Sequence, residues 1–332
     1  MSACLVTGGA GFIGSHLVEA LIRDRHQVRV LDNLSTGSKL NLADTLDRID
    51  LIEGDITDRA TAVAAMQGVE LVFHQAALAS VTRSLDDPIA THHVNATGTL
   101  NLLLAARDAG VRRFIYAGCS SAYGSSIKLP KQEADPTNPI SPYAASKLAG
   151  EYYCEIFAHL YNLETVRLRY FNAYGPRQRS DSAYAAVIPR FLAALIDNQR
   201  PVIYGDGHQS RDFTYVSDIV QANLLAARAH RVSGKVYNVA CGNQVSLLEI
   251  LRIAKGILSS EIEPIHSAPR PGDVRHSLAD TSLAQADLGY CSSVDFAKGL
   301  ERCLSHQLES RQTIRANGTK SHSTRHLLAS LV

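Results

Sequence analysis

The sequence predicts an α/β fold: a doubly wound parallel sheet with a smaller, interleaved C-terminal α/β lobe. Three observations lead to this prediction. Short apolar runs alternate with longer amphipathic ones over the first half of the chain, a glycine-rich turn separates the first such pair, and loop-rich segments interrupt the pattern from residue 170 onward. Strands that alternate with helices form right-handed crossover units, which build a parallel sheet covered on both faces.

Each element is expected from the local spacing of apolar residues. Short apolar runs bounded by turn residues indicate strands, whereas apolar residues at helical spacing indicate helices. The expected strands are Ala3–Thr7, Gln27–Asp32, Leu51–Glu53, Leu71–Phe73, Phe114–Ala117, Thr165–Arg169 and Lys235–Val239. The expected helices of the first half are Phe12–Asp24, Thr61–Gln67 and Ala90–Ala109.

Composition excludes several classes of protein. The 332 residues carry 33 Lys and Arg against 32 Asp and Glu, a net charge of +1, which offers no global field to nucleic acid or a membrane surface. The apolar runs are too short to span a bilayer, and the first residues lack the pattern of a secretory signal. Six scattered cysteines without a CxxC pair favour reduced thiols over a zinc cage. We therefore expect a cytoplasmic protein that binds no metal, nucleic acid or membrane.

A glycine-rich turn predicts a nucleotide site. Gly8, Gly11 and Gly14 stand between the first expected strand and the first expected helix. Gly8 permits a tight turn, Gly11 lets the backbone approach a pyrophosphate, and Gly14 lets helix and strand pack closely. The free N–H groups of the helix N-terminus, which Phe12 and Ile13 begin, would face the phosphates.

Polar residues at the ends of three further strands complete this site. Asp32 ends the second strand about 20 residues after the glycine turn, where a carboxylate accepts from a ribose hydroxyl. Because Asp32 also repels a 2′-phosphate, NAD is favoured over NADP. Asp55 follows the third strand and would lie near the adenine. The expected contacts also include Asn33, Ile56, Gln75, Ala76 and Ala77.

A tyrosine and a lysine four residues apart predict acid–base chemistry. Tyr143 and Lys147 would lie on one face of a helix, one turn from each other. A free phenol titrates near pH 10, and a neighbouring ammonium together with the positive nicotinamide ring would favour the phenolate. Ser120 and Ser121 directly follow the strand Phe114–Ala117, so a hydroxyl there would lie at the ligand-binding edge of the sheet.

The motifs together resemble one family. The blocks TGGAGFIGSHL, DNLSTG, HQAALASV, NATGTLNLL, SPYAASK, RYFNAYGPRQ, GDGHQSRDFTYVSDI and RPGDVRHSLAD resemble the signature blocks of extended short-chain dehydrogenases/reductases, in the nucleotide-sugar epimerase branch. The resemblance runs from about Cys4 to Leu304. It implies a Rossmann NAD-binding domain over residues 1–169, with strands near 235–240 returning to it. A substrate-binding lobe would cover 170–312, and 313–332 would form a disordered tail.

The resemblance also implies roles for individual residues. Tyr143 would be the base, Lys147 its tuner and ribose anchor, and Ser120 the hydroxyl partner; Ser121 is an alternative, because Cys119 occupies a place where relatives often carry Ser or Thr. The implied cofactor contacts are those named above, with Tyr143, Lys147 and Phe171. The implied substrate contacts are Ser80, Ser120, Ser121, Asn172, Gln178, Ala186, Val187, Arg211, Arg270, Asp273 and Ser277.

Departures from other branches narrow the implied reaction. The family's dehydratases carry an Asp-Glu pair after the active-site hydroxyl residue and its decarboxylases a Ser-Glu, whereas this chain reads Ser-Ser-Ala. The resemblance therefore implies 4-epimerisation of a UDP-hexose through a 4-keto intermediate, with tightly bound NAD recycled. Ser277 stands at the position that limits the group on sugar carbon 2, and its small side chain favours UDP-GlcNAc and UDP-GalNAc.

Alternatives remain at this stage. Two other substrates stay open, UDP-glucose and UDP-N-acetylglucosaminuronate, because epimerases that act on them carry the same blocks. An NAD-sensing regulator is the non-enzyme alternative, although such proteins typically lose the Tyr or the Lys. The helices over Ala90–Ala109 and Tyr143–Leu160 resemble the family's four-helix contact, which predicts a homodimer. An N-acetylhexosamine epimerase would supply surface polysaccharide or lipopolysaccharide assembly.

Overall fold

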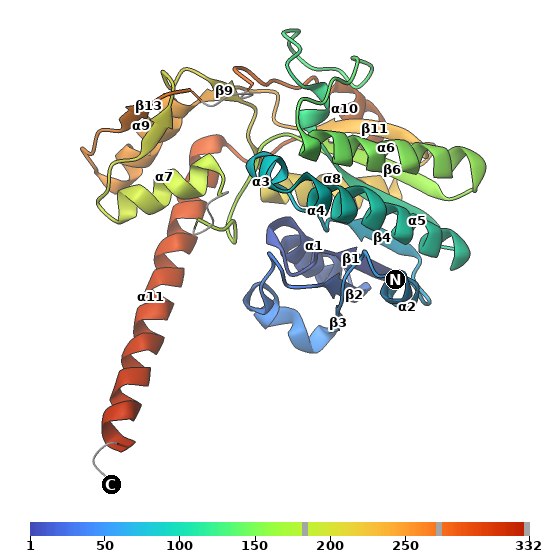
Figure 1. Ribbon diagram of the computed structural model, residues 1–332, viewed down its shortest axis with the longest axis horizontal. Helices are drawn as coiled ribbons and strands as arrows, with labels where there is room; N and C mark the ends of the chain where they lie inside the picture. Colours follow the sequence, from blue (N-terminus) through green and yellow to red (C-terminus); the bar gives the residue numbers. More distant parts are fainter. Residues whose placement is uncertain (181–184, 270–273, 329–332) are drawn as a thin grey trace.

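A computed structural model describes residues 1–180, 185–269 and 274–328, with side chains as far as residue 312. Within this part, seven parallel strands form one sheet in the order β11-β6-β5-β4-β1-β2-β3 (Figure 1). The strands are β1 (Ala3–Thr7), β2 (Gln27–Asp32), β3 (Ile49–Glu53), β4 (Leu71–His74), β5 (Arg113–Cys119), β6 (Glu164–Tyr170) and β11 (Lys235–Val239). The α/β fold with a parallel sheet is thus confirmed.

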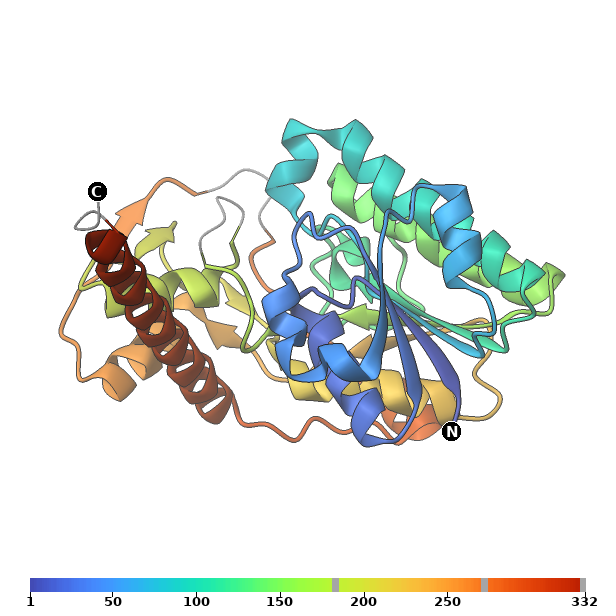
Figure 2. The same cartoon turned by 90° about the horizontal axis from the view of Figure 1, so that it is seen from below.

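Helices cover both faces of this sheet, which Figure 2 shows between its two helix layers. One layer consists of α1 (Phe12–Arg23), α8 (Val216–Arg228) and α10 (Ser282–Leu288), and the other of α2 (Arg59–Ala65), α5 (Thr99–Asp108) and α6 (Pro142–Leu160). Alternate strand residues enter the two cores: Cys4 and Val6 pack toward α1, whereas Leu5 packs toward α5. A strand buried on both faces reads as a continuous apolar run, as the first strand does.

The helix expected over Ala90–Ala109 is interrupted. The structure divides it into α4 (Pro88–His92), the π-helical turn η2 (His93–Gly98) and α5, after the short helix α3 (Val81–Asp86). Within the π turn, the buried Asn95 amide accepts from the backbone N–H of Leu78 at 2.8 Å and donates to the Ser146 hydroxyl at 3.1 Å. The wider turn therefore ties the loop after β4 to α6, and π turns of this kind often mark functional regions.

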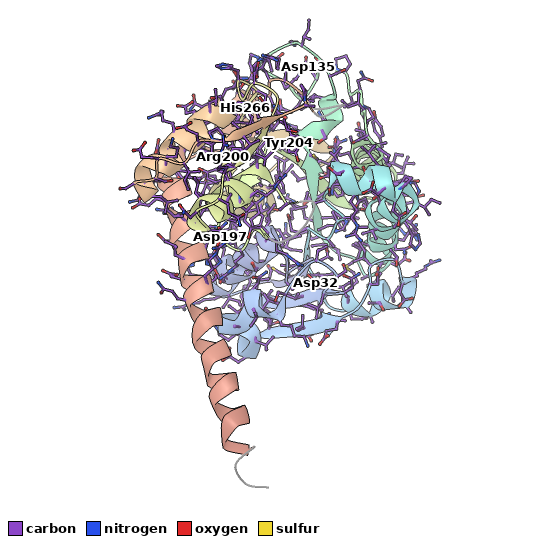
Figure 3. All side chains as sticks on the ribbon, turned by 60° about the vertical axis from the view of Figure 1, so that its left-hand side comes forward. Asp32, Asp135, Asp197, Arg200, Tyr204 and His266 are labelled. Atoms are coloured by element: carbon purple, nitrogen blue, oxygen red, sulfur yellow. The ribbon has the colours of Figure 1, made fainter. Side chains whose placement is uncertain are left out.

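Two short 3₁₀ helices complete the sheet lobe, η1 (Lys39–Arg48) and η3 (Ser120–Tyr123). The second lobe packs three helices around its own core, α7 (Val187–Ile196), α9 (Leu247–Leu258) and the start of α11 (Phe296–Leu328). Its short strands pair as β10 (Thr214–Tyr215) with β7 (Ala173–Tyr174), β12 (Val245–Ser246) with β9 (Ser210–Arg211), and β13 (Ile265–Ser267) with β8 (Val202–Tyr204). Figure 3 labels Asp32 on the sheet lobe, and Tyr204 and His266 on the second lobe.

The C-terminal segment differs from the sequence prediction. Helix α11 runs outward from the second lobe (Figure 1), and its backbone continues through residue 328, over most of the segment expected to be a disordered tail. A helix needs only local backbone hydrogen bonds, and this segment contains no proline to break them. Among the described residues, no helix is both long enough and apolar enough to cross a membrane.

Candidate active site

The glycine turn has the geometry that a close approach to phosphates requires. Gly8 adopts φ +67°, and its N–H donates to the carbonyl of Leu31 at 2.8 Å. A Cβ on Gly14 would lie 2.1 Å from the Gly8 carbonyl oxygen, so no larger residue fits where α1 begins. Helix α1 has no side-chain cap, which leaves the N–H groups of its first turn, including those of Phe12 and Ile13, to a ligand. These features fit a dinucleotide.

Asp32 joins the glycine turn to the loop after β2. Its carboxylate accepts from the backbone N–H of Ala10 at 2.9 Å and of Leu34 at 2.8 Å. Burial raises the pKa of Asp32, and these two hydrogen bonds partly offset that rise. Each carboxylate oxygen can accept a second hydrogen bond, so the contact with a ribose hydroxyl remains available.

The neighbouring strand ends bring the other expected cofactor residues to the same edge. Asn33 donates to the carboxylate of Asp55 at 2.8 Å, beside the buried Ile56. Burial acts to raise the pKa of Asp55, but hydrogen bonds from Thr57 and Asn33 outweigh it, and that pKa lies below its usual value. Asp55 therefore stays ionised at neutral pH.

The end of β4 packs directly against the glycine turn. The backbone of Ala76 lies where a Cβ on Gly8 would come within 2.7 Å, and Ala77 follows it. Gln75 donates to the hydroxyl of Tyr170 at 3.1 Å, so its side chain bridges β4 and β6. His74 is buried, with both ring nitrogens in hydrogen bonds to threonine hydroxyls, so it is a packed core residue.

Tyr143 and Lys147 lie on the first turns of α6, where the Ser141 hydroxyl accepts from the N–H of Ala144. The buried Lys147 ammonium stands 4.3 Å from the centre of the Tyr116 ring. Burial lowers the pKa of Lys147 to about 8, against the opposing influence of Cys119 and Glu151. Lys147 is therefore mostly charged at pH 7 and loses its proton within the range of an ordinary pH profile.

The phenol itself differs from the prediction. The sequence predicts a Tyr143 whose pKa is lowered by the neighbouring ammonium, but in the structure burial raises the pKa of Tyr143 well above its usual value, with further contributions from Cys119 and Tyr116. Burial removes water from around the phenol and thereby disfavours its charged form. A base at this position needs additional positive charge.

The residue that influences Tyr143 is also not the one expected. Cys119, the last residue of β5, contributes to the raised pKa of Tyr143, and its Sγ lies 3.1 Å from the Ser121 Oγ. Ser120 is partly buried, and among the described residues its hydroxyl has no hydrogen bond that would link it to Tyr143. The structure therefore links Cys119 to Ser121 by a hydrogen bond and to the expected base by its charge effect alone.

The expected substrate residues that the structure describes lie along the second lobe and the loops facing it. Ser80 caps α3 and accepts from the N–H of Arg83. Asn172 adopts φ +25° and donates to the carbonyl of Asp212 at 2.9 Å. Phe171 is buried against Tyr123, so its ring packs in a small core, and its contact with the nicotinamide stays a prediction.

The structure also describes most of the other residues that the sequence predicts to bind the substrate. Gln178 has a buried Oε1 without a hydrogen-bond partner among the described residues, which leaves an acceptor for a ligand. Arg211 donates to the carbonyls of Ser210 and Arg275. Ser277 donates its backbone N–H to the carbonyl of Ser210, so it lies beside Arg211. Ala186 and Val187 begin α7, and Arg270 and Asp273 lie outside the described residues.

Two buried groups were missed by the sequence interpretation. Glu151, one turn after Lys147, forms an ion pair with Arg169, with contacts of 2.9 to 3.2 Å. Its four-residue spacing from Lys147 was the available signal, because it places both side chains on one helix face. Asp212 accepts from the backbone N–H groups of Cys241, Gly242 and Ala279, partners that no local pattern in the sequence joins.

The site combines a glycine turn, carboxylates at strand ends and a Tyr–Lys pair at the edge of a parallel sheet. These features define an α/β enzyme that uses a dinucleotide. Residues 4–240 match the model of the NAD-dependent epimerase/dehydratase family. The chain belongs to this family, its cofactor is NAD, and the resemblance read from the motifs is confirmed.

Relatives extend over nearly the whole chain. A UDP-glucose 4-epimerase of Mycolicibacterium smegmatis is 39% identical over 302 residues, which are 90% of this chain and 96% of the relative. The solved UDP-N-acetylglucosamine 4-epimerase of Methanobrevibacter ruminantium, in complex with UDP-N-acetylmuramic acid, is 38% identical with a TM-score of 0.89 over 93% of this chain and 99% of that one. The NAD complex of a UDP-glucose 4-epimerase from Thermus thermophilus is 34% identical, with a TM-score of 0.84 over 92% and 98%.

Proposed function

We propose that the chain interconverts the 4-epimers of a UDP-hexose, with UDP-GlcNAc and UDP-GalNAc as its preferred pair. The observation that carries the proposal is the Tyr143–Lys147 pair on the first turns of α6, together with the glycine turn that Gly14 keeps narrow. Bound NAD would supply the hydride acceptor and donor at sugar carbon 4. A single site then serves both directions, and no second redox substrate is required.

Tyr143 takes the proton from the sugar's 4-hydroxyl in this proposal. Because burial raises the pKa of Tyr143, the charged Lys147 and the cofactor's positive charge must act together on the phenol before it can accept a proton. The 4-ketosugar turns within the pocket. Tyr143 returns the proton to the 4-oxygen once the hydride would have returned to the other face of carbon 4. On the cofactor side, Asp32 binds the backbone of the glycine turn and Gln75 bridges β4 and β6.

Two observations favour an epimerase over the family's other reactions. Residues Ser120 to Ala122 present no carboxylate beside Tyr143 that could act at carbon 6. The nearby carboxylate of Glu151 is held by Arg169 at 2.9 Å, so it is engaged in an ion pair. Dehydration and decarboxylation therefore have no free acid or base at this position among the described residues.

The proposed preference for substrates with an N-acetyl group on carbon 2 rests on Ser277. Its backbone is held by the carbonyl of Ser210 and the amide of Gln244, which fixes where its small side chain lies. A pocket rejects an oversized group more firmly than a smaller one, so activity on UDP-glucose is expected as well. The solved relative that is named for UDP-N-acetylglucosamine supports this choice, and the relatives named for UDP-glucose support that alternative.

The deciding experiment compares three substrates. The purified protein, without added NAD, is incubated with UDP-GlcNAc, UDP-glucose and UDP-N-acetylglucosaminuronate, and the 4-epimers are separated by chromatography. UDP-GalNAc forming fastest supports the proposal. Product from UDP-glucose alone, or from the uronate alone, assigns the chain to that branch instead, and no product even with NAD supplied would favour the NAD-sensing regulator.

A homodimer is the proposed assembly. Helix α6 presents Tyr152, Ile156 and Leu160 at four-residue spacing, 51%, 43% and 71% exposed, and Ile89 on the adjacent α4 is 82% exposed. An apolar stripe of this kind is typical of a surface that a second copy covers. The substitution Ile156→Glu should give monomers by light scattering after size exclusion, whereas Ile127→Glu, on a loop, should leave the mass unchanged.

The proposed setting is the cytoplasm, because all six cysteines are free in the structure, as expected where thiols stay reduced. There the product would supply the assembly of polymers that contain N-acetylhexosamines. Retention of the free thiols during purification without reductant is the simple check on this part of the proposal.

A further inference from the structure

Tyr116 lies in the middle of β5, in the core that this strand shares with α6. It is fully buried, and its hydroxyl donates to the backbone carbonyl of Lys147 at 2.9 Å. The helix comes close to this ring, since a Cβ on Gly150 would lie 2.3 Å from the Tyr116 hydroxyl and 2.7 Å from the ring carbon that carries it. The ring is therefore held directly against the backbone of α6, with no side chain between them.

The same ring faces the charged end of the Lys147 side chain. The ammonium nitrogen lies 4.3 Å from the ring centre, and Lys147 is only 4% exposed. A buried ammonium is strongly disfavoured unless a partner replaces the water that it has lost. The face of an aromatic ring is electron-rich, and its attraction for a cation is stronger where water is excluded. One tyrosine thus binds both the backbone and the charge of Lys147.

Neighbouring charged groups are engaged elsewhere. Glu151, one turn after Lys147, is bound by Arg169 through contacts of 2.9 to 3.2 Å. His74 stacks on the other side of Tyr116, with 5.6 Å between ring centres, and burial holds its pKa well below the usual value. The described residues therefore place an aromatic face, and no free carboxylate, beside the ammonium of Lys147.

We propose that Tyr116 is a positioning residue for Lys147: its hydroxyl fixes the helix turn, and its ring face keeps the ammonium in place and charged where it acts on Tyr143. This inference rests on the proposed function, since it takes Tyr143 as the base and Lys147 as its tuner. Burial raises the pKa of Tyr116 well above the usual value, so its phenol stays neutral and takes no part in proton transfer.

The contact has a consequence for the pH dependence of turnover. Burial lowers the pKa of Lys147 to about 8, so loss of this proton should set the alkaline limb of the kcat profile. Because the ring stabilises the charged form, a weaker ring should lower that pKa further and move the limb to lower pH. The titratable groups around Lys147 are Tyr143, Glu151 and Cys154 on α6, Tyr116 and Cys119 on β5, His74 on β4 and Arg169 on β6.

The first test weakens the ring face while keeping the shape of the ring. Position 116 of the holoenzyme receives phenylalanine, or phenylalanine with ring fluorines that withdraw charge from the face, and UDP-sugar turnover is followed against pH. Tyr116→Phe should lower kcat by about threefold, the loss of one hydrogen bond, and keep the alkaline limb of the parent. With three ring fluorines the limb should move about one pH unit lower, and kcat above the limb should fall about tenfold with KM nearly unchanged.

A second aromatic contact gives the matched control. The Arg107 guanidinium lies 5.1 Å from the centre of the Tyr161 ring, which is partly exposed. The same series of rings at position 161 should leave kcat and its pH profile unchanged. An alkaline limb that stays fixed through the series at position 116 overturns the proposal. A limb that moves as far in Tyr116→Phe as in the fluorinated chain also contradicts it, because the hydroxyl rather than the ring face would then be responsible.

The second test needs no turnover. Cyanate reacts only with a neutral amine: the lysine nitrogen bonds to the cyanate carbon, and its proton passes to the cyanate nitrogen. The extent at Lys147 and at the exposed Lys298 is followed against pH by peptide mass spectrometry. Three ring fluorines at position 116 should lower the midpoint for Lys147 by about one pH unit relative to Tyr116→Phe, and leave Lys298 unchanged.

The two tests separate this inference from the proposed function. Equal midpoints for Lys147 in the two chains would overturn the contact between ring and ammonium, even in a protein that epimerises UDP-sugars. A lowered midpoint in a protein that epimerises no UDP-sugar would defeat the proposed function and preserve the contact.

Discussion

The two halves of the site are built in different ways. On the cofactor side, Gly8, Asp32 and Gln75 stand at or directly after the ends of three adjacent parallel strands, so backbone pairing sets their distances. On the proposed sugar side, Ser277 and Arg211 lie on short segments that are joined by hydrogen bonds between residues far apart in the chain. The sheet fixes the cofactor half, whereas long-range contacts fix the sugar half.

The difference has a functional consequence. Asp212 is fully buried and binds three backbone N–H groups, so it ties the loop after β11 to the segment that carries Ser277. Lys131 binds the same segment through the carbonyl of Leu278. Sugar preference can therefore change through a few tertiary contacts while the sheet and the cofactor half stay the same.

The largest effect is expected where the two halves meet. Tyr143→Phe should lower turnover by about 10²- to 10⁴-fold, the contribution of a positioned acid–base group, while NAD stays bound. Turnover is measured with the preferred UDP-sugar, and NAD is released by heat and quantified. Tyr161→Phe, at the exposed end of the same helix, serves as the control. Turnover near the parent value in the Tyr143 variant would exclude this residue as the base.

The second largest effect is expected from a change confined to the cofactor half. Gly14→Ala places a Cβ where only 2.1 Å separates it from the Gly8 oxygen, so the turn must open and the amount of NAD that copurifies should fall by about tenfold or more. Gly256→Ala is the matched control, because that helical glycine has nothing within 4 Å of the added Cβ. Full NAD content in the Gly14 variant would contradict the close packing of helix and strand.

A change confined to the sugar half should alter selectivity alone. Ser277→Tyr should lower kcat/KM for UDP-GlcNAc by about 10- to 200-fold relative to UDP-glucose, with the same NAD content as the parent. Ser277→Ala should keep the parent ratio, because it leaves the same space. A uniform loss on both substrates would mean that Ser277 supports the segment rather than limiting the sugar's carbon 2 group.

The smallest effect concerns the stability of the sugar half. Burial raises the pKa of Asp212 to about 6, above its unfolded value. The stability that this group contributes is therefore fully present below its unfolded pKa of about 4 and is lost as the pH rises through about 6. The difference in Tm between the parent and Asp212→Asn should shift in favour of the parent when the pH falls from 7.5 to 5. A difference independent of pH would mean that Asp212 does not titrate in this range.

Much of the sheet lobe was predictable because its signals are local. The run Ala3–Thr7 and the run Gln27–Asp32 became β1 and β2 with the expected ends, since a buried parallel strand needs only a short apolar run between turn residues. The interruption at Asn95 was not predictable. The π turn there serves contacts with Leu78 and Ser146, and neither contact leaves a trace in the helical period.

The sequence by itself determined the parallel sheet, the glycine turn with Asp32, and the presence of Tyr143 and Lys147 on one helix face. These depend on residue spacing along single elements and on steric limits of the backbone. Only the tertiary structure decided that Cys119 influences the phenol, that Phe171 is buried, and that Asp212 joins the loop after β11 to the segment of Ala279. It also decided the sign of the pKa change at Tyr143, because that sign depends on how much water the folded chain removes from around the phenol.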